Sequence, residues 1–553
     1  MLAIAAAAFA VEIPFFFSGF PSGHDFEFHL YTWLEVFGQW KQGIAYPRWA
    51  ALAQFGYGEP RFIFYPPASW TLGAALRAVF PWILVPGIYI FLTLVAAGVS
   101  MFLLSRQLLE RRDATFAAVL YAVNPYHLVI VYWRSAFAEL LASSLLPLLL
   151  LLVLRIELRI EQPIEEPLKE NNRRMTVFLA LVLAASWLIN APAAVMIHYS
   201  LALLIVVYAC VRRSSRILIT GIFAVLLGAA LAAFYLLPAI YEQKWVNIAE
   251  AVSPGVRPVD SFLFARTTDP DHDAFNHLVS AVATAEILLT LAAAWAARNW
   301  RTRRRELWYL LVGWAVVCAV LMLSITGPLW TILPKLRFVQ FPWRLLLCLG
   351  IPFTLLTTLG FRRWTARVAV CIAMLGVLAF VWLHFQAPWW DHLADLREMQ
   401  DFMASGAGYE GVDEYTPVGT QPPLDVDKDA RRVTVEGAAH ASIRVSDWSA
   451  QRKVFTAEMS APDNLALRLF NYPAWNVEVN SRPVQAGTLA GTGQMLVPVE
   501  AGTNRVQITF VRTWDRKFSP WISLLALLLV LILLRKPTFA EPSSAIMPLN
   551  SGR

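Results

Sequence analysis

Residues 82–104, WILVPGIYIFLTLVAAGVSMFLL, contain no charged side chain. A helix needs about 20 apolar residues to cross the hydrocarbon core of a bilayer, so this stretch predicts a transmembrane helix. The whole chain has the same character: of its 553 residues 58% are hydrophobic and 15% are charged, with a mean hydropathy of +0.52. A soluble domain has too much surface to hide this apolar content. The composition therefore indicates a polytopic α-helical membrane protein.

Similar apolar blocks recur along the chain and predict about 12 transmembrane helices. The first block, 1–19, lacks the basic flank of a secretory signal peptide and is interpreted as a membrane helix. The predicted spans are 1–19, 82–104, 114–131, 136–154, 175–189, 193–211, 217–238, 278–297, 307–325, 345–360, 367–385 and 519–534.

Arginines cluster in every second loop between these blocks, as in Arg106/Arg111/Arg112 and Arg362/Arg363/Arg367. Basic loops stay on the cytoplasmic side of a membrane, so this alternation predicts that both termini are cytoplasmic in a bacterial inner membrane. The net charge of +7 is explained by these clusters and not by nucleic-acid binding. The long segments 20–81, 239–277, 326–344 and 386–518 then lie on the outer side.

Residues 388–518 differ from the rest, because segments such as ASIRVSDW and WNVEVNSRPV alternate apolar and polar residues between Gly, Pro and Asn turns. They predict an extracytoplasmic β-sandwich domain. The predicted organisation is thus a transmembrane domain at 1–387 with an external first loop at 20–81, the β-domain at 388–518, a last helix at 519–536 and a cytoplasmic tail at 537–553.

The segment Gly23–His29, GHDFEFH, carries two acids and two histidines directly after the first span. On a helix, Asp25 and His29 share one face, and His24 and Glu27 share another. Asp25, Glu27 and His29 offer ligand types that bind a divalent metal, but their spacing matches no closed zinc pattern, so metal dependence is left open. The alternative interpretation is an interfacial loop whose polar groups face water.

Two aromatic- and proline-rich motifs follow, YPRW with Arg48 and GYGEPRFIFYPP with Arg61 and Tyr65. This composition predicts a rigid surface at the membrane interface. Arg48 and Arg61 are candidates to bind a phosphate group through paired N–H donors. Contact with ordinary lipid headgroups is the alternative for each arginine.

Two more motifs, YWRSAFAE and FVQFPWR, place charge close to the predicted hydrocarbon boundary. Unpaired charge is costly there, so a salt bridge between Arg134 and Glu139 is expected. Arg337 and Arg344 lie on the predicted outer side, against the positive-inside trend, which favours an anionic ligand such as a lipid-linked phosphate.

The motifs HDFEFH, YPRW, GYGEPRFIFYPP, NPYH, YWRSAFAE and FVQFPWR, together with the C-terminal NYPAWNVEVNSRPV, resemble the bacterial membrane family named "6-pyruvoyl-tetrahydropterin synthase-related". That family is similar to the GT-C superfamily of integral-membrane glycosyltransferases. The resemblance covers nearly the whole chain and implies a GT-C-like fold. It also implies a polyprenyl-phosphate sugar donor, a cell-envelope glycan, lipid or protein as acceptor, and an active site at the outer membrane face.

In this resemblance Asp25 matches the acidic residue of the first external loop, with Glu27 second. A polyprenyl phosphate is a good leaving group, so the remaining task is to deprotonate the acceptor hydroxyl, which a carboxylate such as Asp25 performs as a general base. No cofactor is required. The cations expected to stabilise the donor phosphate are Arg48, Arg61, Arg337 and Arg344, and the supporting residues are His24, His29, Tyr65, Arg134 and Glu139.

Two other functions are compatible with the sequence. A transporter or flippase of lipid-linked glycans is one, although transporters usually contain internal repeats and the chain has no recognisable repeat. The other is a non-catalytic envelope scaffold whose β-domain binds glycan.

Overall fold

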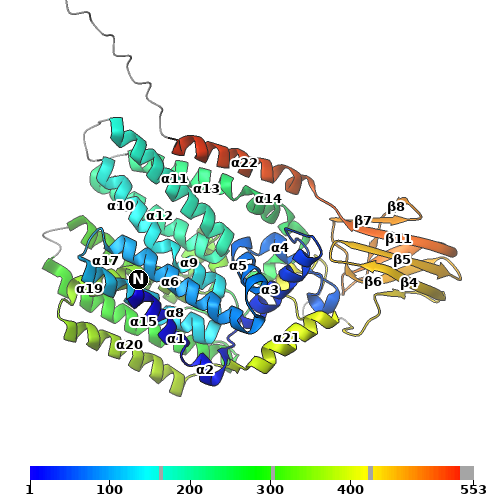
Figure 1. Ribbon diagram of the computed structural model, residues 1–553, viewed down its shortest axis with the longest axis horizontal. Coiled ribbons are helices and arrows are strands. Elements are labelled where there is room, and N and C mark those ends of the chain that lie inside the picture. Colours follow the sequence, from blue (N-terminus) through cyan, green and yellow to red (C-terminus); the bar gives the residue numbers. More distant parts are fainter. Residues whose placement is uncertain (161–165, 214, 300–304, 421–426, 536–553) are drawn as a thin grey trace, which may run out of the picture.

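The computed structural model describes residues 1–160, 166–213, 215–299, 305–420 and 427–535. Figure 1 shows a large body of helices, with a smaller β-rich part projecting from one end. Both parts have their own hydrophobic core, one formed by the helices and one by the strands. The predicted tail 537–553 lies outside the described residues.

The helical body contains long helices and several short ones in the connecting segments. The helices are α1 (Leu2–Glu12), α2 (Phe15–Ser18), α3 (Phe26–Lys41), α4 (Arg61–Phe64), α5 (Pro67–Val79), α6 (Val85–Ser105), α7 (Arg111–Ala122), α8 (Pro125–Val129), α9 (Phe137–Ser143), α10 (Leu145–Ile160), α11 (Glu166–Ile189), α12 (Ala191–Arg212), α13 (Arg216–Leu231), α14 (Ala233–Glu242), α15 (Pro270–Ala296), α17 (Arg305–Leu321), α18 (Gly327–Ile332), α19 (Leu346–Gly360), α20 (Trp364–His384), α21 (Leu393–Ser405) and α22 (Trp514–Leu534).

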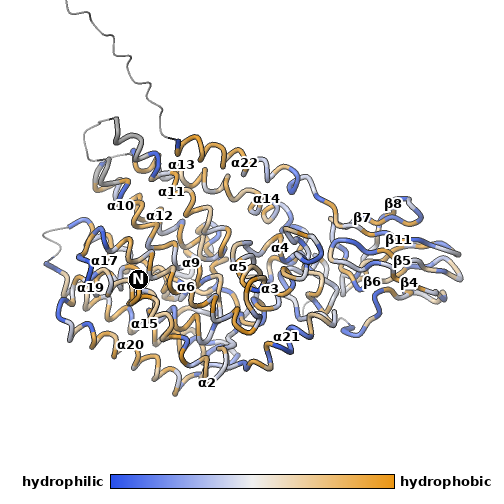
Figure 2. The backbone as a smooth tube through the Cα atoms, viewed as in Figure 1, coloured by the Kyte–Doolittle hydropathy of each residue, from blue (hydrophilic) through white to orange (hydrophobic). Residues whose placement is uncertain are grey.

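Eight helical segments in the described part are long and apolar enough to cross a membrane. Two further segments pass the same test but are sharply bent, α13 with α14 by 77° and α17 with α18 by 87°. Counting each bent pair as one span gives ten, and the apolar helix at Leu2–Ser18 is shorter. Figure 2 shows the apolar residues running along these helices. The structure thus supports eight to ten candidate spans, and the count of about 12 stays a prediction.

The β-rich part consists of two antiparallel sheets. One has the strand order β3-β6-β10-β9 and the other the order β4-β5-β11-β7-β8. Both sheets contribute buried side chains to one hydrophobic cluster, as the predicted alternation requires. The strands are β3 (Val433–Val435), β4 (Ala441–Trp448), β5 (Arg452–Met459), β6 (Asp463–Phe470), β7 (Trp475–Val479), β8 (Arg482–Val484), β9 (Gly487–Thr488), β10 (Gln494–Val499) and β11 (Gly502–Phe510).

The first long connection, 20–81, folds between the two parts. Its amphipathic stretches form α3 and α5, which pack on each other. A two-residue strand, β1 (Phe20–Pro21), pairs with β2 (Trp390–Asp391) and ties the start of this connection to the segment before α21. Trp49 and Tyr57 belong to the hydrophobic cluster of the sheets. Through these contacts the connection joins the helical body to the β-rich part.

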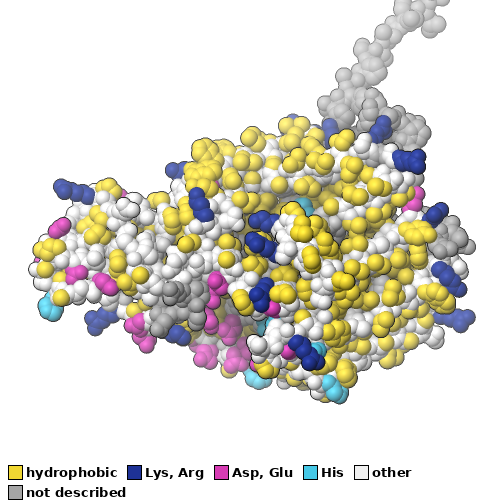
Figure 3. All heavy atoms as spheres, turned by 180° about the vertical axis from the view of Figure 1, so that it is seen from behind, with side chains coloured by type: hydrophobic (Ala, Val, Ile, Leu, Met, Phe, Trp, Pro, Cys, Tyr) yellow, Lys and Arg dark blue, Asp and Glu magenta, His cyan; other side chains and the backbone are white. Residues whose placement is uncertain are grey.

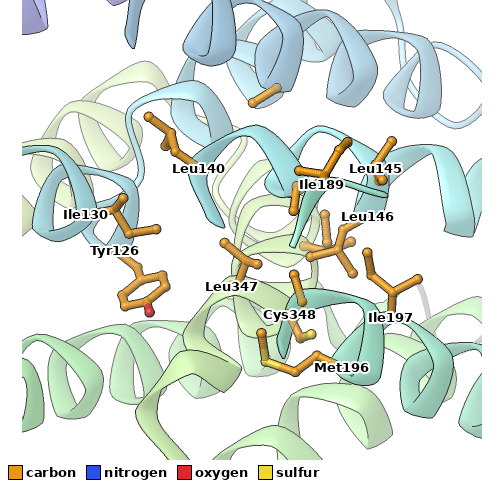
Figure 4. Packing of buried hydrophobic residues seen from close by; sticks show 14 of the residues in the cluster. Tyr126, Ile130, Leu140, Leu145, Leu146, Ile189, Met196, Ile197, Leu347 and Cys348 are labelled. Carbon is orange, nitrogen blue, oxygen red and sulfur yellow. The ribbon is translucent and has the colours of Figure 1, made fainter. Parts of the chain in front are cut away.

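The core of the helical body is tightly filled. Figure 4 shows side chains converging from α8, α9, α10, α12 and α19, among them Tyr126, Leu140, Met196 and Leu347. All of these residues are buried. Close packing of this kind fixes neighbouring polar groups in one position, because interiors have few voids.

Candidate functional site

Two motifs that are distant in sequence dock against each other through their backbones. The backbone N–H groups of His24 and Asp25 donate to the carbonyl oxygens of Trp133 (3.3 Å) and Arg134 (2.9 Å). The Ser135 hydroxyl accepts from the Gly23 N–H, also at 2.9 Å. A Cβ on Gly23 would overlap the Trp133 carbonyl and lie 2.6 Å from the Arg134 nitrogen, so only glycine permits this approach.

The second of these motifs has an irregular backbone. Residues Ile130–Arg134 form a π-helical turn, and Ser135 follows with a φ of 50°. Such turns and left-handed residues are uncommon and gather at functional sites. Here the irregular turn carries Arg134 to the N-terminal end of α3.

Glu139, whose side chain is 1% exposed, lies at the centre of a buried polar cluster. Its Oε2 atom is 2.5 Å from Nη1 of Arg134 and 3.1 Å from Nε of Arg344, and its Oε1 accepts a hydrogen bond of 2.6 Å from the Tyr126 hydroxyl. The expected salt bridge between Arg134 and Glu139 is therefore present. A second arginine shares the same carboxylate, so the three charged groups carry a net charge of +1.

Asp25 lies at the open edge of this cluster. It is the N-cap residue of α3, its side chain is 41% exposed, and its Oδ2 is 3.8 Å from Nη2 of Arg134. The Arg134 guanidinium also lies over the ring of Trp343, 4.9 Å from the centroid. The arrangement places one accessible carboxylate beside a pair of buried guanidinium groups. Such a site can accept a proton and can stabilise negative charge.

The predicted supporting residues surround Asp25. The ring of His24 meets Phe275 edge-on, with ring centroids 4.8 Å apart. His29 is buried against Phe137, at 5.2 Å between centroids, and burial lowers the pKa of His29 to about 4, which keeps its imidazole neutral at pH 7. Burial together with the charge of Asp25 raises the pKa of Tyr65, which stays a neutral hydroxyl.

Glu27 lies on a different face from Asp25, in a group of carboxylates. Burial, Asp391 and Glu410 all raise the pKa of Glu27. Figure 3 shows acidic side chains gathered where the helical body meets the β-rich part. Among the residues that the structure describes, no three His, Cys, Asp or Glu side chains are grouped closely enough to hold a metal ion. The suggested metal site at Asp25, Glu27 and His29 thus has no support from the geometry.

The other predicted cations are dispersed. Arg61 is fully buried, with Nε 2.6 Å from Glu59, and donates to the Thr32 hydroxyl at 2.8 Å. Arg48 lies over the Tyr46 ring, 4.3 Å from its centroid. Arg337 is exposed and stacks on Phe338, its neighbour in sequence. Of the four arginines predicted to face a donor phosphate, Arg344 alone forms an ion pair with the Glu139 cluster.

Burial lowers the pKa of Arg48, and Arg516 lowers it further, while Glu242 opposes this effect. Arg516 and Glu242 form a second charged group, a bidentate pair with two contacts of 2.6 Å. This group joins α14 to the start of α22.

The roles of Tyr126 and Gln340 were not predicted from the sequence. Tyr126 stands in the NPYH motif and donates to Glu139, while the Gln340 side chain accepts from Nη1 of Arg344 at 2.9 Å. Both residues stand in aromatic–proline motifs that were identified in the sequence, and this position was the sequence signal of a functional role. Their partners lie in other segments, which no local pattern reveals.

The chain is similar to one protein family and to several solved structures. Residues 62–387 match the family model described as "6-pyruvoyl-tetrahydropterin synthase related domain; membrane protein". No curated protein matches the chain. Similar solved structures include arabinofuranosyltransferase AftD from Mycobacteria, at 18% identity and a TM-score of 0.41, with 68% of this chain and 26% of that chain covered.

The oligosaccharyltransferase of Archaeoglobus fulgidus is a second similar solved structure, at 14% identity and a TM-score of 0.39, with 75% of this chain and 56% of that chain covered. The chain thus spans about a quarter of the first structure and just over half of the second. At TM-scores below 0.5 these resemblances do not establish a shared fold. The family model, in contrast, covers more than half of the chain, and the protein belongs to the 6-pyruvoyl-tetrahydropterin synthase related family of membrane proteins.

Proposed function

We propose that the protein is a membrane glycosyltransferase that moves a sugar from a polyprenyl-phosphate donor to a hydroxyl group of a cell-envelope acceptor. The observation that carries this proposal is the position of Asp25. Its accessible carboxylate stands 3.8 Å from Arg134, at the edge of a cluster in which two guanidinium groups share Glu139. A base and an anion-stabilising group side by side suit the transfer of a sugar from a phosphate.

In the proposed reaction Asp25 accepts the proton of the acceptor hydroxyl while the hydroxyl oxygen attacks the anomeric carbon. The bond between the anomeric carbon and the phosphate oxygen breaks, and the phosphate leaves with the electron pair. Arg134 and Arg344 stabilise the charge that develops on it. One displacement of this kind inverts the anomeric carbon, and no general acid is needed.

The supporting residues hold this arrangement in place. Because Glu139 binds both arginines, their guanidinium groups keep one orientation and need not reorganise during the reaction. The backbone contacts between Asp25 and Arg134 fix the base relative to these cations. The proposed outer face is the side on which the β-rich part and the connection 20–81 lie.

Asp25→Asn tests the proposal in purified protein reconstituted in lipid. The substitution keeps size and removes the base, so transfer of labelled sugar from a polyprenyl-phosphate donor should fall by about a hundred- to ten-thousand-fold. Asp401→Asn, an exposed carboxylate on α21, is the matched control and should leave the rate unchanged. Near-normal activity of Asp25→Asn would rule out the mechanism.

Two further variants separate the roles of the neighbouring groups. Glu27→Gln should cost less activity than Asp25→Asn, because Glu27 belongs to the acidic group, whereas the described carboxylates that pair with Arg134 and Arg344 are Asp25 and Glu139. Arg344→Ala should raise the KM for the donor, because it removes a partner of the phosphate while leaving the base. An unchanged donor KM in Arg344→Ala would show that Arg344 does not bind the donor phosphate.

A further inference from the structure

A cleft lies away from Asp25, where the β-rich part meets the connection 20–81. It is an open cleft of about 520 Å³, within the usual size range of small-molecule sites. One wall is the segment after α3, including Gln42, and the other is the end of β4 with the turn to β5, including Asp447, Trp448 and Gln451. Neither the proposed reaction nor the charged groups described above use these residues.

The polar side chains of this cleft are available to a ligand. Within the described part of the chain, Gln42 and Gln451 form hydrogen bonds through their backbones, and their side-chain amides form none with the protein. Asp447 makes one loose ion pair, with 3.7 Å between its Oδ2 and Nη1 of Arg452. Each amide offers a donor pair and an acceptor, and the carboxylate accepts two or more hydrogen bonds. Such groups match the neighbouring hydroxyls of a sugar ring.

Trp448 adds an aromatic surface to the same cleft. Its indole is half-buried: Lys453 and Arg432 lie over the ring, 5.4 Å and 5.9 Å from its centroid, and the remaining part is accessible beside the polar groups. A flat indole buries a large apolar area and can donate one hydrogen bond at its edge. Sugar rings combine an apolar C–H face with polar edges, so an indole next to amide groups is a suitable receptor for them.

The charged residues at the cleft indicate which class of ligand it binds. The residues described along the cleft include Asp447 and no Lys, Arg or His. Three cations lie next to the cleft and each already has a partner: Arg452 pairs with Asp447, while Arg432 and Lys453 lie over the ring of Trp448. A phosphate or a carboxylate would have to compete with these contacts and would be repelled by Asp447. The lining therefore favours a neutral, hydroxyl-rich ligand.

The position of the cleft relative to Asp25 is set by one helix. Asp25 precedes α3 and Gln42 follows it, and a helix of 16 residues is about 24 Å long. The two places thus lie at opposite ends of one rigid element. A ligand in the cleft cannot reach Asp25 unless it is an extended chain.

We propose that this cleft is a carbohydrate-binding site that holds a neutral oligosaccharide. Binding there does not depend on the transfer reaction proposed above. If that reaction takes place, the cleft would hold a distant part of an extended acceptor, about 24 Å from the reacting hydroxyl.

The test uses the full chain in lipid nanodiscs and saturation-transfer NMR with neutral hexasaccharides of glucose, mannose, galactose and N-acetylglucosamine. At least one hexasaccharide should give a signal from which a Kd can be measured. Trp448→Ala should weaken that Kd by about tenfold or more, because buried tryptophans dominate such contacts. Trp448→Phe should retain most of the affinity, since it keeps an aromatic face.

Gln451→Ala should also weaken binding. It provides an independent test if Trp448→Ala fails to fold. Gln485→Ala is its matched control, because Gln485 is an exposed glutamine directly after β8, at the opposite edge of the same sheet. It should leave the Kd unchanged. The proposal is overturned if no hexasaccharide gives a signal, if Trp448→Ala and Gln451→Ala bind like the wild type, or if a peptide probe gives a signal where the sugars give none.

Discussion

Nη1 of Arg134 lies 2.5 Å from Oε2 of Glu139, and both side chains are buried. The same carboxylate also faces Arg344, so one acid neutralises part of the charge of two arginines. Breaking a buried ion pair by removing one partner is costly, because the remaining charge is left without compensation.

Glu139→Ala should therefore destabilise the protein by about 3–5 kcal/mol. Tyr126→Phe, which removes the hydrogen bond to the same carboxylate and a weaker one from Arg134, should cost about 1.5–3 kcal/mol, as is typical of hydrogen bonds to charged groups. Thermal unfolding in nanodiscs measures both effects. Equal melting temperatures for Glu139→Ala and the wild type would show that the cluster does not stabilise the fold.

Gly23→Ala should displace the segment that carries Asp25. The added Cβ would overlap the Trp133 carbonyl, and overpacking of this kind typically costs about 1–3 kcal/mol. Glycosyl transfer should fall together with stability, because the backbone contacts of Asp25 would be lost. Gly38→Ala in α3 is the matched control, since a Cβ there meets nothing within 4 Å and alanine favours the helix. Equal behaviour of the two variants would contradict the close approach at Gly23.

The buried Lys453 should make the free energy of unfolding depend on pH. Burial lowers its pKa from 10.5 to about 7, while Asp447 opposes this shift. Between about pH 7 and 10.5 the unfolded chain binds more protons at this lysine than the folded chain, so the free energy of unfolding rises with pH in that window. Below about pH 7 both states are protonated and the slope vanishes.

Lys453→Met should remove this slope and should stabilise the protein at neutral pH. The measurement is the unfolding temperature of wild type and variant from pH 6 to 10, compared pair by pair. A difference between the two proteins that stays constant over this range would show that Lys453 titrates normally in the folded state.

The orientation of the chain is tested by reporter fusions. Fusions after Arg112, Arg216 and Arg305 should report the cytoplasm, because these arginines belong to basic loops. Fusions near Gly255 and Gly419 should report the outer side. Reversal of two of these results would place the Asp25 site on the cytoplasmic face and would remove the basis for a lipid-linked donor there.

Much of the fold follows from local patterns. Apolar blocks such as 82–104 predict helices because a helix must satisfy its own backbone in lipid, and α6 forms there. The alternation in ASIRVSDW predicts a strand, and β4 has that pattern of burial. The bends between α13 and α14 and between α17 and α18 were not predicted, because hydropathy reports the length of an apolar segment and not its direction.

The candidate site was predictable only in part. The pair of Arg134 and Glu139 follows from the cost of unpaired charge near hydrocarbon, which acts within one short segment. The sequence by itself thus determined the membrane class, the two-part organisation and this ion pair. Only the tertiary structure decided which other arginine joins it, since Arg48, Arg61, Arg337 and Arg344 look alike as sequence. Arg61 is neutralised by nearby Glu59, whereas Arg344 reaches Glu139 through the packing of distant segments. The reason is physical: the role of a charged side chain is set by the partner that it meets on burial, and chain folding alone brings that partner to it.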